Sequence, residues 1–341
     1  MIKDKLHRFI QNKLSCRDFF STYNFAYEGK IYNPIYNPNL ALELDRPKIY
    51  NQFGKEMDTW FIRDFHSAHC PHRITSKYFL WDRFDIGLET HFYTHEAMLQ
   101  TMGTPKRRYG LFVESESIVP SSYSIFKNRP TLHKDFDAIF TYSEDHLNTI
   151  SNAKLFVSCA TVWYGNEKGS NVTLSPNQYK EKTKNISMIC SNKVMTYFHS
   201  VRHRFAFNSL QSGKVDIFGT FNGGAYLEFK SDSLRDYRFQ IVVENDISAY
   251  YFTEKILDCF VSMTVPIYLG ATRISDFFNS EGIIFISEKD SDNINKIVGR
   301  CDEKLYEDML PAIIDNYNKA LRYLNVYDRL YEDYFKISDV L

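Results

Sequence analysis

The stretch that decides the fold is YRFQIVVENDISAYYFTEKILDCFVSMTVPIYLGA, residues 237–271. It opens with a short apolar run that ends in Glu-Asn, and it closes with a second apolar run that ends in Gly-Ala. Between the two runs lie a polar loop and the segment TEKILDCFVSM, whose apolar residues at 256, 257, 260 and 261 have helical spacing. Strand, helix and strand in this order, with strands that are apolar throughout, predict a parallel sheet covered on both faces.

The start of this predicted helix carries polar chemistry. Thr253 is a suitable N-cap residue, which places Glu254 and Lys255 in the first helical turn. Free N–H groups make a helix N-terminus favourable for phosphate, whereas a lysine at that end opposes the helix dipole. Lys255 therefore indicates an anion supplied by a ligand, and Glu254 offers two acceptor oxygens to a diol such as ribose. The ordinary alternative is that Glu254 only complements the dipole and that Lys255 is solvated.

The same alternation of strands and helices extends along most of the chain. Apolar runs of strand type occupy 46–53, 109–115, 136–146, 153–159, 186–192, 214–219, 237–245, 265–271 and 282–287, and helical spacing occurs at 94–102, 199–212, 253–263 and 302–336. The polar stretch 165–186 is typical of a linker. Because 341 residues exceed the usual size of one hydrophobic core, we expect two α/β domains, 1–170 and 171–341, with a ligand cleft at the strand ends.

Composition limits the classes of partner. The formal net charge is −1, so the chain lacks the basic excess of a nucleic-acid binder. Six scattered cysteines without a CxxC pair are predicted to be buried free thiols of a reducing compartment. The N-terminal MIKDKLHRFIQNKLSC has no continuous apolar segment of signal-peptide type, and no run approaches ~18 apolar residues. These features predict a cytoplasmic protein.

At this point a family resemblance becomes specific. Residues 244–271 resemble the nucleotide-sugar signature of glycosyltransferase family 10, the α-1,3/1,4-fucosyltransferases, in its bacterial type. The matching positions are Glu244, Asn245, Tyr251, Thr253, Glu254, Lys255, Pro266, Tyr268 and Gly270. The resemblance implies a GT-B fold, two Rossmann-like domains facing a central cleft, with GDP-fucose as donor and no required metal cofactor. Asp246 departs from the family's usual Ser or Thr, which leaves the donor deoxysugar open, and stimulation by a divalent metal stays an open alternative.

A second matching segment lies upstream. SNKVMTYFHSVRHRFAFNSLQSGKVDIFG, residues 191–219, looks like the family segment in which an arginine contacts the donor pyrophosphate. Counted back from Val215, the family spacing points to Arg202, and Arg204 is close enough to compete. The resemblance implies that this arginine and Lys255 balance the charge on departing GDP. It also implies that Glu254 holds the ribose, with Glu244, Asn245 and Tyr251 completing the donor site.

The first domain carries a shorter match. LFVESESIVP, residues 111–120, is similar to the family's Phe-Glu-Ser segment, whose glutamate is the general base. The resemblance implies that Glu114 takes the proton of the acceptor hydroxyl in an inverting single displacement. Glu116 is the rival, since two residues apart in a strand would share a face, and a solvated strand end is the ordinary alternative. Residues 1–170 would then bind the acceptor, and 171–341 the GDP-sugar, with terminal helices.

Two histidine-rich stretches are weaker signals. His66, His69, Cys70 and His72 crowd into seven residues with no second cluster nearby, so we predict an acceptor loop or plain surface and no metal site. His91 and His95 are four residues apart, which on a helix would place them on one face. They are candidate acceptor contacts, with a partly buried polar network as the alternative.

The expected partners are a GDP-sugar donor and an oligosaccharide or lipid-linked glycan acceptor such as lipopolysaccharide, with no nucleic acid. Regularly placed Leu and Tyr residues at 321–334 predict a helix that packs across both domains. Peripheral association with the cytoplasmic face of the inner membrane stays an open alternative. Two functional alternatives stand beside fucosyl transfer: another GDP-deoxysugar such as GDP-colitose, and a non-catalytic glycan- or nucleotide-binding protein, against which the presence of both Glu114 and Lys255 argues.

Overall fold

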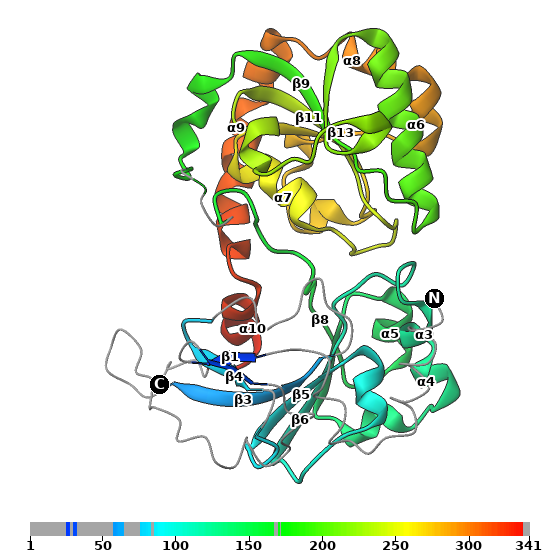
Figure 1. The fold of residues 1–341 in the computed structure, drawn as a ribbon, viewed down its shortest axis with the longest axis vertical. Helices are drawn as coiled ribbons and strands as arrows, with labels where there is room; N and C mark the ends of the chain where they lie inside the picture. Colours follow the sequence, from blue (N-terminus) through cyan, green and yellow to red (C-terminus); the bar gives the residue numbers. More distant parts are fainter. Residues whose placement is uncertain are drawn as a thin grey trace. The chain divides into compact units, whose positions relative to one another are not determined.

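The structure is a computed structural model that describes residues 57–64, 76–82, 85–166, 170 and 172–336. It also describes the backbone of two short antiparallel strands, β1 (Phe25–Tyr27) and β2 (Lys30–Tyr32). Backbone packing divides the chain into two units (Figure 1). The first comprises residues 1–113, 121–140 and 150–154, and the second 114–120, 141–149 and 155–341. The strand predicted at 46–53 and the cluster of His66, His69, Cys70 and His72 lie outside the described residues.

The first unit is built on a six-stranded sheet. Its strands are β3 (Asp58–Arg63), β4 (Phe79–Asp82), β5 (Thr90–Thr94), β6 (Arg107–Leu111), β7 (Ala138–Thr141) and β8 (Ala153–Leu155), in the order β4-β3-β5-β6-β7-β8. The pairs β3–β4, β3–β5, β5–β6 and β6–β7 are parallel. Trp60 stacks on Phe79 and Phe92 at centroid distances of 3.9 and 5.5 Å, so aromatic rings form much of this core.

Short helices connect the later strands of this unit. They are η3 (His95–Leu99), α3 (Pro120–Tyr123), α4 (Ile125–Asn128) and η4 (Leu132–Asp135). The prediction of a helix over 94–102 reduces to the 3-10 turn η3, because His95 adopts a φ of 50° directly after β5. The sequence pattern did not predict β3, β4 or β5. Their sequences, DTWFIR, FLWD and THFYT, are short and mix aromatic with charged and polar residues, without a clear period of two.

The second unit is built on a five-stranded parallel sheet. Its strands are β9 (Lys184–Ile189), β10 (Val215–Phe218), β11 (Tyr237–Val243), β12 (Val265–Leu269) and β13 (Ile284–Phe285), in the order β10-β9-β11-β12-β13. Every neighbouring pair is parallel. Helices cover both faces: α6 (Tyr197–Ser212) packs with α8 (Ile294–Val298), and α7 (Glu254–Val261) packs with α9 (Glu303–Ala320) (Figure 1). All five strands were predicted from the sequence, and they are confirmed.

Helices α6 and α7 begin and end where local chemistry requires. Thr196 and His199 form a reciprocal capping box at the start of α6, and Gly213, with a φ of 64°, ends that helix. The Thr253 side chain accepts a hydrogen bond from the Lys255 N–H at 3.3 Å, which confirms the predicted N-cap of α7. The predicted apolar face of α7, from Ile256 to Val261, is buried.

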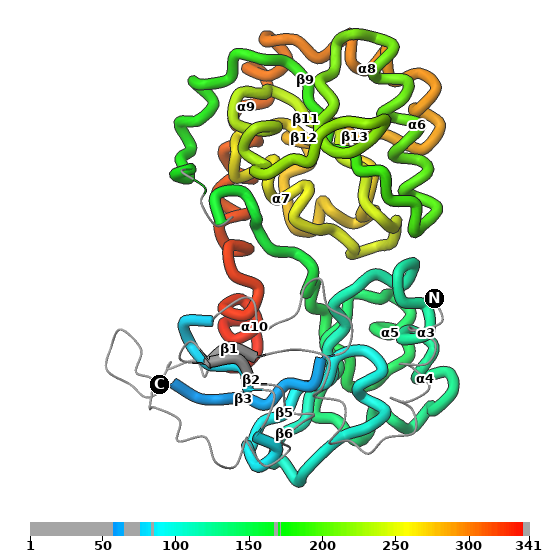
Figure 2. The backbone as a smooth tube through the Cα atoms, viewed as in Figure 1, coloured from blue at the N-terminus to red at the C-terminus, as the bar shows by residue number. Residues whose placement is uncertain are grey.

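The C-terminal part is helical, as predicted, although the helix is interrupted. After α9 the chain forms η11 (Leu321–Tyr323) and then α10 (Val326–Tyr334) (Figure 2). Asn325 caps α10 by accepting hydrogen bonds from the N–H groups of Tyr327 and Asp328, so the aromatic residues of 321–334 do not share one continuous helix. Arg329 of α10 is buried, and it donates to the carbonyls of Val157 and Ala160.

Three further observations concern the described residues. The cysteines of the described residues, Cys159, Cys190, Cys259 and Cys301, are free thiols. The described part of the chain contains no helix that is long and apolar enough to cross a bilayer. Within the same part, no group of three or more His, Cys, Asp and Glu side chains could hold a metal ion.

Candidate functional site

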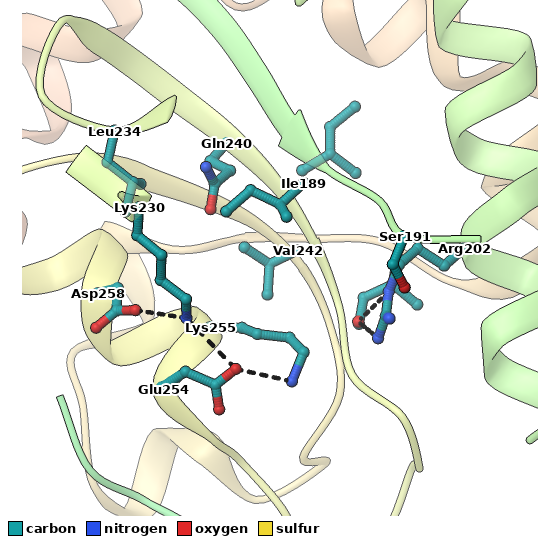
Figure 3. Close-up of a pocket in the computed structure, with 12 residues that line it drawn as sticks. Ile189, Ser191, Arg202, Lys230, Leu234, Gln240, Val242, Glu254, Lys255 and Asp258 are labelled. Carbon is teal, nitrogen blue, oxygen red and sulfur yellow. Dashed lines mark hydrogen bonds and ion pairs between the residues drawn. The ribbon is translucent and has the colours of Figure 1, made fainter. Parts of the chain in front are cut away.

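A cavity of about 170 Å³ lies in the second unit at the carboxyl ends of β9 and β11 (Figure 3). In chain order the sheet reads 2-1-3-4-5, so β9 and β11 are the first and third strands, and successive connections leave them in opposite directions. Open parallel sheets bind ligands at this switch point. The lining residues are Ile189, Ser191, Arg202, Lys230, Leu234, Gln240, Ile241, Val242, Val243, Glu254, Lys255 and Asp258. Whole-ligand sites usually measure ~300–1,000 Å³, so this cavity suits one polar portion of a larger ligand.

Arg202 reaches the cavity from α6. Its guanidinium donates to the Val243 carbonyl from Nε at 3.0 Å and from NH2 at 2.5 Å, and NH2 also donates to Oδ1 of Asn245 at 2.7 Å. The side chain is buried, and burial lowers the pKa of Arg202 from its ordinary value, against the field of Glu244. Because an arginine remains protonated even then, the sheet end holds a fixed positive charge.

Arg204 is placed differently, although it is only two residues away. It is exposed, and its NH2 group pairs with Glu288 at 2.5 Å. The structure therefore brings Arg202 to the cavity and leaves Arg204 on the outer side of α6.

Glu244 links the end of β11 to the start of α7. It is fully buried, and its carboxylate accepts hydrogen bonds from the Thr253 N–H at 2.9 Å and the Thr253 hydroxyl at 2.8 Å. The Nζ atom of Lys255 lies 3.3 Å from Oε2 of Glu244. Gly270 packs against the same carboxylate, because a Cβ there would lie 2.7 Å from Glu244 Cγ and 2.2 Å from the Tyr268 hydroxyl. These motif residues shape the site from behind.

Three side chains of α7 and Lys230, which precedes β11, place alternating charges along the cavity wall. Glu254 Oε1 lies 3.3 Å from Lys255 Nζ and 3.4 Å from Lys230 Nζ, and Lys230 also pairs with Asp258 at 2.7 Å (Figure 3). Burial alone would lower the pKa of Lys230, but the pairs with Asp258 and Glu254 outweigh it and raise that pKa above its ordinary value. Lys255 and Arg202 thus offer positive charge to an anion, beside the acceptor oxygens of Glu254.

Sequence reasoning missed Lys230 and Asp258. Lys230 begins the short turn η7 (Lys230–Ser233), in a stretch without strand or helix periodicity. Asp258 was the available signal, because it is a charged residue on the otherwise apolar inner face of α7, and it is only 1% exposed. A buried carboxylate requires partners, which points to a cation elsewhere in the chain.

Asn245 and Tyr251 lie beside the cavity without lining it. Asn245 bonds Arg202 through its side chain, and its carbonyl accepts from the hydroxyl of Thr196 at 2.9 Å. Tyr251 is buried with its ring 5.7 Å from that of Tyr142. Burial, reinforced by Cys159, Glu244 and Glu114, raises the pKa of the Tyr251 hydroxyl well above its ordinary value, so this hydroxyl stays neutral.

Glu114 lies in a turn, so the expectation that it shares a strand face with Glu116 is wrong. Strand β6 ends at Leu111, and the Ser115 carbonyl accepts from the N–H groups of Ile118 and Val119 at 3.1 and 3.0 Å. Glu114 is half-buried, whereas Glu116 is exposed.

The turn that carries Glu114 belongs to the second unit and lies near the end of β11. The Ser117 hydroxyl donates to the Asn245 carbonyl at 3.3 Å, and its N–H donates to Asp246 at 3.4 Å. Asp246, the position that departs from the family pattern, therefore contacts this turn. The two segments predicted to carry the base and the donor site meet here.

The structure places His91 and His95 in the core of the first unit, where both are fully buried. His91 Nδ1 lies 2.9 Å from the Tyr93 hydroxyl, and burial lowers the pKa of His91 to about 4. His95 Nε2 accepts from the Val113 N–H at 3.0 Å. Because His91 belongs to β5 and His95 to η3, they do not lie on one helix face. They form the polar network that was weighed against acceptor contact.

Comparisons with known proteins agree with the motif. Residues 179–303 match the family model described as glycosyltransferase family 10 (fucosyltransferase) C-term, which confirms the predicted resemblance. The α-(1,3)-fucosyltransferase FucT of Helicobacter pylori is 32% identical over 75 residues, which are 22% of this chain and 15% of that protein. The match thus spans a small part of that relative's length.

Solved structures extend the likeness to the fold. The Anabaena protein HepE, solved in complex with UDP-glucose, superposes with a TM-score of 0.52 and 8% identity over 82% of this chain and 99% of its own. A crystal structure of an α1,3-fucosyltransferase superposes with a TM-score of 0.48 and 16% identity over 77% of this chain and 83% of its own. With the two parallel sheets, the likeness to HepE confirms the predicted class, an α/β fold of GT-B type with two Rossmann-like domains.

Proposed function

Because residues 179–303 carry the C-terminal domain of glycosyltransferase family 10, we propose that the protein transfers fucose from GDP-fucose to a hydroxyl group of a glycan acceptor. The observation that carries this proposal is the cavity at the switch point of the second sheet. There the family's signature residues Glu254 and Lys255 line one cavity together with Arg202. The matched relative's name, an α-(1,3)-fucosyltransferase, favours fucose and an α-1,3 linkage.

On the donor side, each residue has a role that its chemistry allows. Arg202 presents a planar guanidinium, which suits phosphate oxygens, and Lys255 presents a point charge at the N-terminus of α7. Glu254 accepts hydrogen bonds from the ribose diol. Glu244 and Asn245 hold the cations and the helix start in place, and Tyr251 supports the loop between them. Arg204 has no donor role in this proposal, because it pairs with Glu288 on the outer side of α6.

The reaction is a single displacement with inversion. The acceptor oxygen forms a bond to the anomeric carbon, while the bond from that carbon to the β-phosphate oxygen breaks and its electron pair leaves with GDP. The proton of the acceptor hydroxyl passes to the Glu114 carboxylate. Arg202 and Lys255 stabilise the charge that grows on the departing diphosphate. Such a step needs no metal ion fixed by the protein, although stimulation by a divalent metal stays open.

In this proposal residues 1–170 bind the acceptor, an oligosaccharide or a lipid-linked glycan, and residues 171–341 bind the GDP-sugar. Exposed Glu116 is the acceptor contact that the structure leaves accessible, whereas His91 and His95 are fully buried and have no part in it. The free cysteines fit a reducing compartment, so we place the protein in the cytoplasm. Peripheral association with the inner face of the membrane is part of the proposal only if the acceptor is lipid-linked.

A donor and acceptor screen tests this proposal. The purified protein is incubated with GDP-fucose, GDP-colitose or GDP-mannose and with lipopolysaccharide or free oligosaccharides, and glycoside products are identified by mass spectrometry and by NMR of the anomeric proton. We expect transfer from GDP-fucose with an anomeric configuration opposite to that of the donor. Transfer from GDP-colitose alone would replace fucose by another deoxysugar. Donor binding without transfer to any acceptor would favour the non-catalytic alternative.

A further inference from the structure

A continuous chain of five alternating charges runs along the cavity wall from Glu244, which lies behind it. It runs Glu244, Lys255, Glu254, Lys230 and Asp258, with successive separations of 3.3, 3.3, 3.4 and 2.7 Å. Neither the family motif nor the sequence periodicity includes Lys230. Glu254, the proposed ribose acceptor, is the central member, and a lysine lies on each side of it.

The two lysines are held very differently. Lys230 is fixed on three sides, because it lies 2.7 Å from Asp258, 3.4 Å from Glu254 and 4.5 Å from the centroid of the Trp163 ring. Lys255 has a more exposed side chain, 24% against 15% for Lys230, and both of its carboxylate contacts measure 3.3 Å, whereas Lys230 has one at 2.7 Å. Lys255 also donates to the Thr253 hydroxyl oxygen at 2.9 Å. Because its side chain is the more exposed and its ion pairs are longer than the Lys230–Asp258 pair, we expect Lys255 to be the cation that turns toward a ligand.

Asp258 makes Lys230 a rigid anchor. Oδ1 of Asp258 accepts from the N–H groups of Trp163 and Tyr164 at 2.8 and 2.9 Å, while its Oδ2 accepts from Lys230. A buried carboxylate with three charge-assisted hydrogen bonds has little freedom to move. Since the chain 163–164 and helix α7 both hold Asp258, they fix the ammonium group of Lys230 beside Glu254.

This difference matters when a nucleoside diphosphate enters. As Lys255 turns toward the phosphates, Glu254 loses one of its two cations and faces a dianion in a partly desolvated cavity. Like charges repel strongly in such a setting. We propose that Lys230 is a positioning residue that keeps the Glu254 carboxylate in place and directed at the ribose diol while Lys255 serves the diphosphate. This inference rests on the proposed function and deepens it by assigning ribose recognition to the Lys230–Glu254 pair.

The test compares two nucleotides that differ only in the diol, GDP and 2′,3′-dideoxy-GDP, by titration calorimetry. A carboxylate that accepts from the diol should give wild type a preference of about tenfold or more for GDP. In Lys230→Met we expect this preference to shrink to about twofold, with the affinity for dideoxy-GDP unchanged, because the diphosphate contacts remain. Lys230→Arg should keep the preference, since it restores a cation beside Glu254.

A second variant guards against loss of folding. Lys230→Met leaves the Asp258 carboxylate buried without its cation, which is destabilising. The double variant Lys230→Met/Asp258→Asn removes both charges and keeps an Oδ1 acceptor for the N–H groups of Trp163 and Tyr164. It should unfold near the wild-type temperature and show the same loss of ribose preference.

The outcomes separate this inference from the function beneath it. Loss of the diol preference with intact dideoxy-GDP affinity supports the positioning role. An equal loss for both nucleotides in the folded double variant overturns it, because Lys230 would then act on the diphosphate or on the general shape of the cavity. An unchanged preference overturns it as well. If wild type binds no GDP at all, the proposed function fails, and this inference fails with it.

Discussion

The two sheets share one strand order, but different side chains follow their strands. Both place their first five strands in the order 2-1-3-4-5, so both have a switch point between the first and third strands. In the second unit this point opens into a cavity lined by Arg202, Lys255 and Glu254. In the first unit the described residues at the corresponding strand ends make hydrogen bonds within the unit. There Arg63 bonds the carbonyl and side chain of Gln100, and His95 bonds the Val113 N–H.

The difference shows that the order of strands permits a site, while the residues after the strands determine whether one forms. Buried carboxylates are stable at the end of β11 because each forms an ion pair with a lysine, and because the N-terminus of α7 adds positive potential. Where His91 and Tyr93 stand in β5, the His91 ring and the Tyr93 hydroxyl bond each other inside an aromatic core.

Glu114 gives the largest expected effect and tests whether the turn after β6 contributes to the second unit's site. In Glu114→Gln, transfer should fall about 10²- to 10⁴-fold, because the proposed general base is lost, while the Kd for GDP stays within about twofold. Initial-rate assays and calorimetry measure the two quantities. Glu116→Gln, an exposed neighbour in the same turn and the proposed acceptor contact, is the matched comparison: it should raise the KM for the acceptor and leave kcat within about twofold. Equal activity of the two variants would remove Glu114 from the mechanism.

Arg202 and Arg204 form a natural pair on one helix, one turned into the cavity and one turned out. Arg202→Met should weaken GDP binding about 100-fold, or about 2.7 kcal/mol, since a buried charge contact to phosphate is removed. Arg204→Met should change it less than about threefold, because the exposed pair with Glu288 contributes little. Calorimetry with GDP measures both. Similar losses in the two variants would contradict the geometry of α6.

Lys182 tests the support beneath the second sheet. It is buried, it donates to the Leu234 carbonyl and the Thr264 hydroxyl at 2.8 and 2.9 Å, and burial lowers its pKa to about 7. Between this value and the ordinary 10.5, the unfolded chain binds a proton that the folded chain does not, so stability rises with pH. From about pH 7.5 to 9, wild type should gain about 2 kcal/mol relative to Lys182→Met.

Urea unfolding at a series of pH values, followed by circular dichroism, measures this difference. Parallel pH profiles of wild type and Lys182→Met would mean that the lysine is protonated in the folded protein. Its burial would then be offset by groups beyond Leu234 and Thr264.

His91 gives the smallest expected effect and reports on the first unit. Its pKa is lowered to about 4 from 6.5, so the unfolded state takes up a proton first as the pH falls, and stability is lost below pH 6.5. Between pH 6.5 and about 5.5, wild type should lose about 1 kcal/mol relative to His91→Gln. The same urea series measures it, and an identical pH slope for both proteins would contradict a buried neutral imidazole. Where the units unfold in separate transitions, His91 and Lys182 should affect different ones.

The sequence predicts the second unit well because its information is contiguous. Strands that are buried on both faces appear in the sequence as continuous apolar runs. The start of α7 is marked by Thr253, a residue type that favours the N-cap position. Arg202 was indicated by the family resemblance, counted back from Val215, which left Arg204 as a rival. Lys230 was not indicated, because its role depends on Asp258 and Trp163, which lie 28 and 67 residues away in the chain and become its partners only after folding.

The first unit was predicted less well for a different physical reason. The strand β5, THFYT, buries a histidine and a tyrosine that satisfy each other, so its polar letters do not indicate exposure. The positive φ of His95 ends that strand abruptly, which no helix or strand periodicity anticipates. Glu114 was assigned to a strand because the apolar run LFV continues past the point where β6 stops pairing.

The central claim is that the switch point of the second sheet binds a guanosine diphosphate sugar. Titration calorimetry of the purified protein with GDP, GDP-fucose, GDP-mannose and UDP tests it most directly. We predict binding of GDP and GDP-fucose, with GDP-fucose preferred over GDP-mannose, little binding of UDP, and loss of GDP binding in Arg202→Met. Binding of UDP as tightly as GDP, or no nucleotide binding by a folded protein, would contradict it.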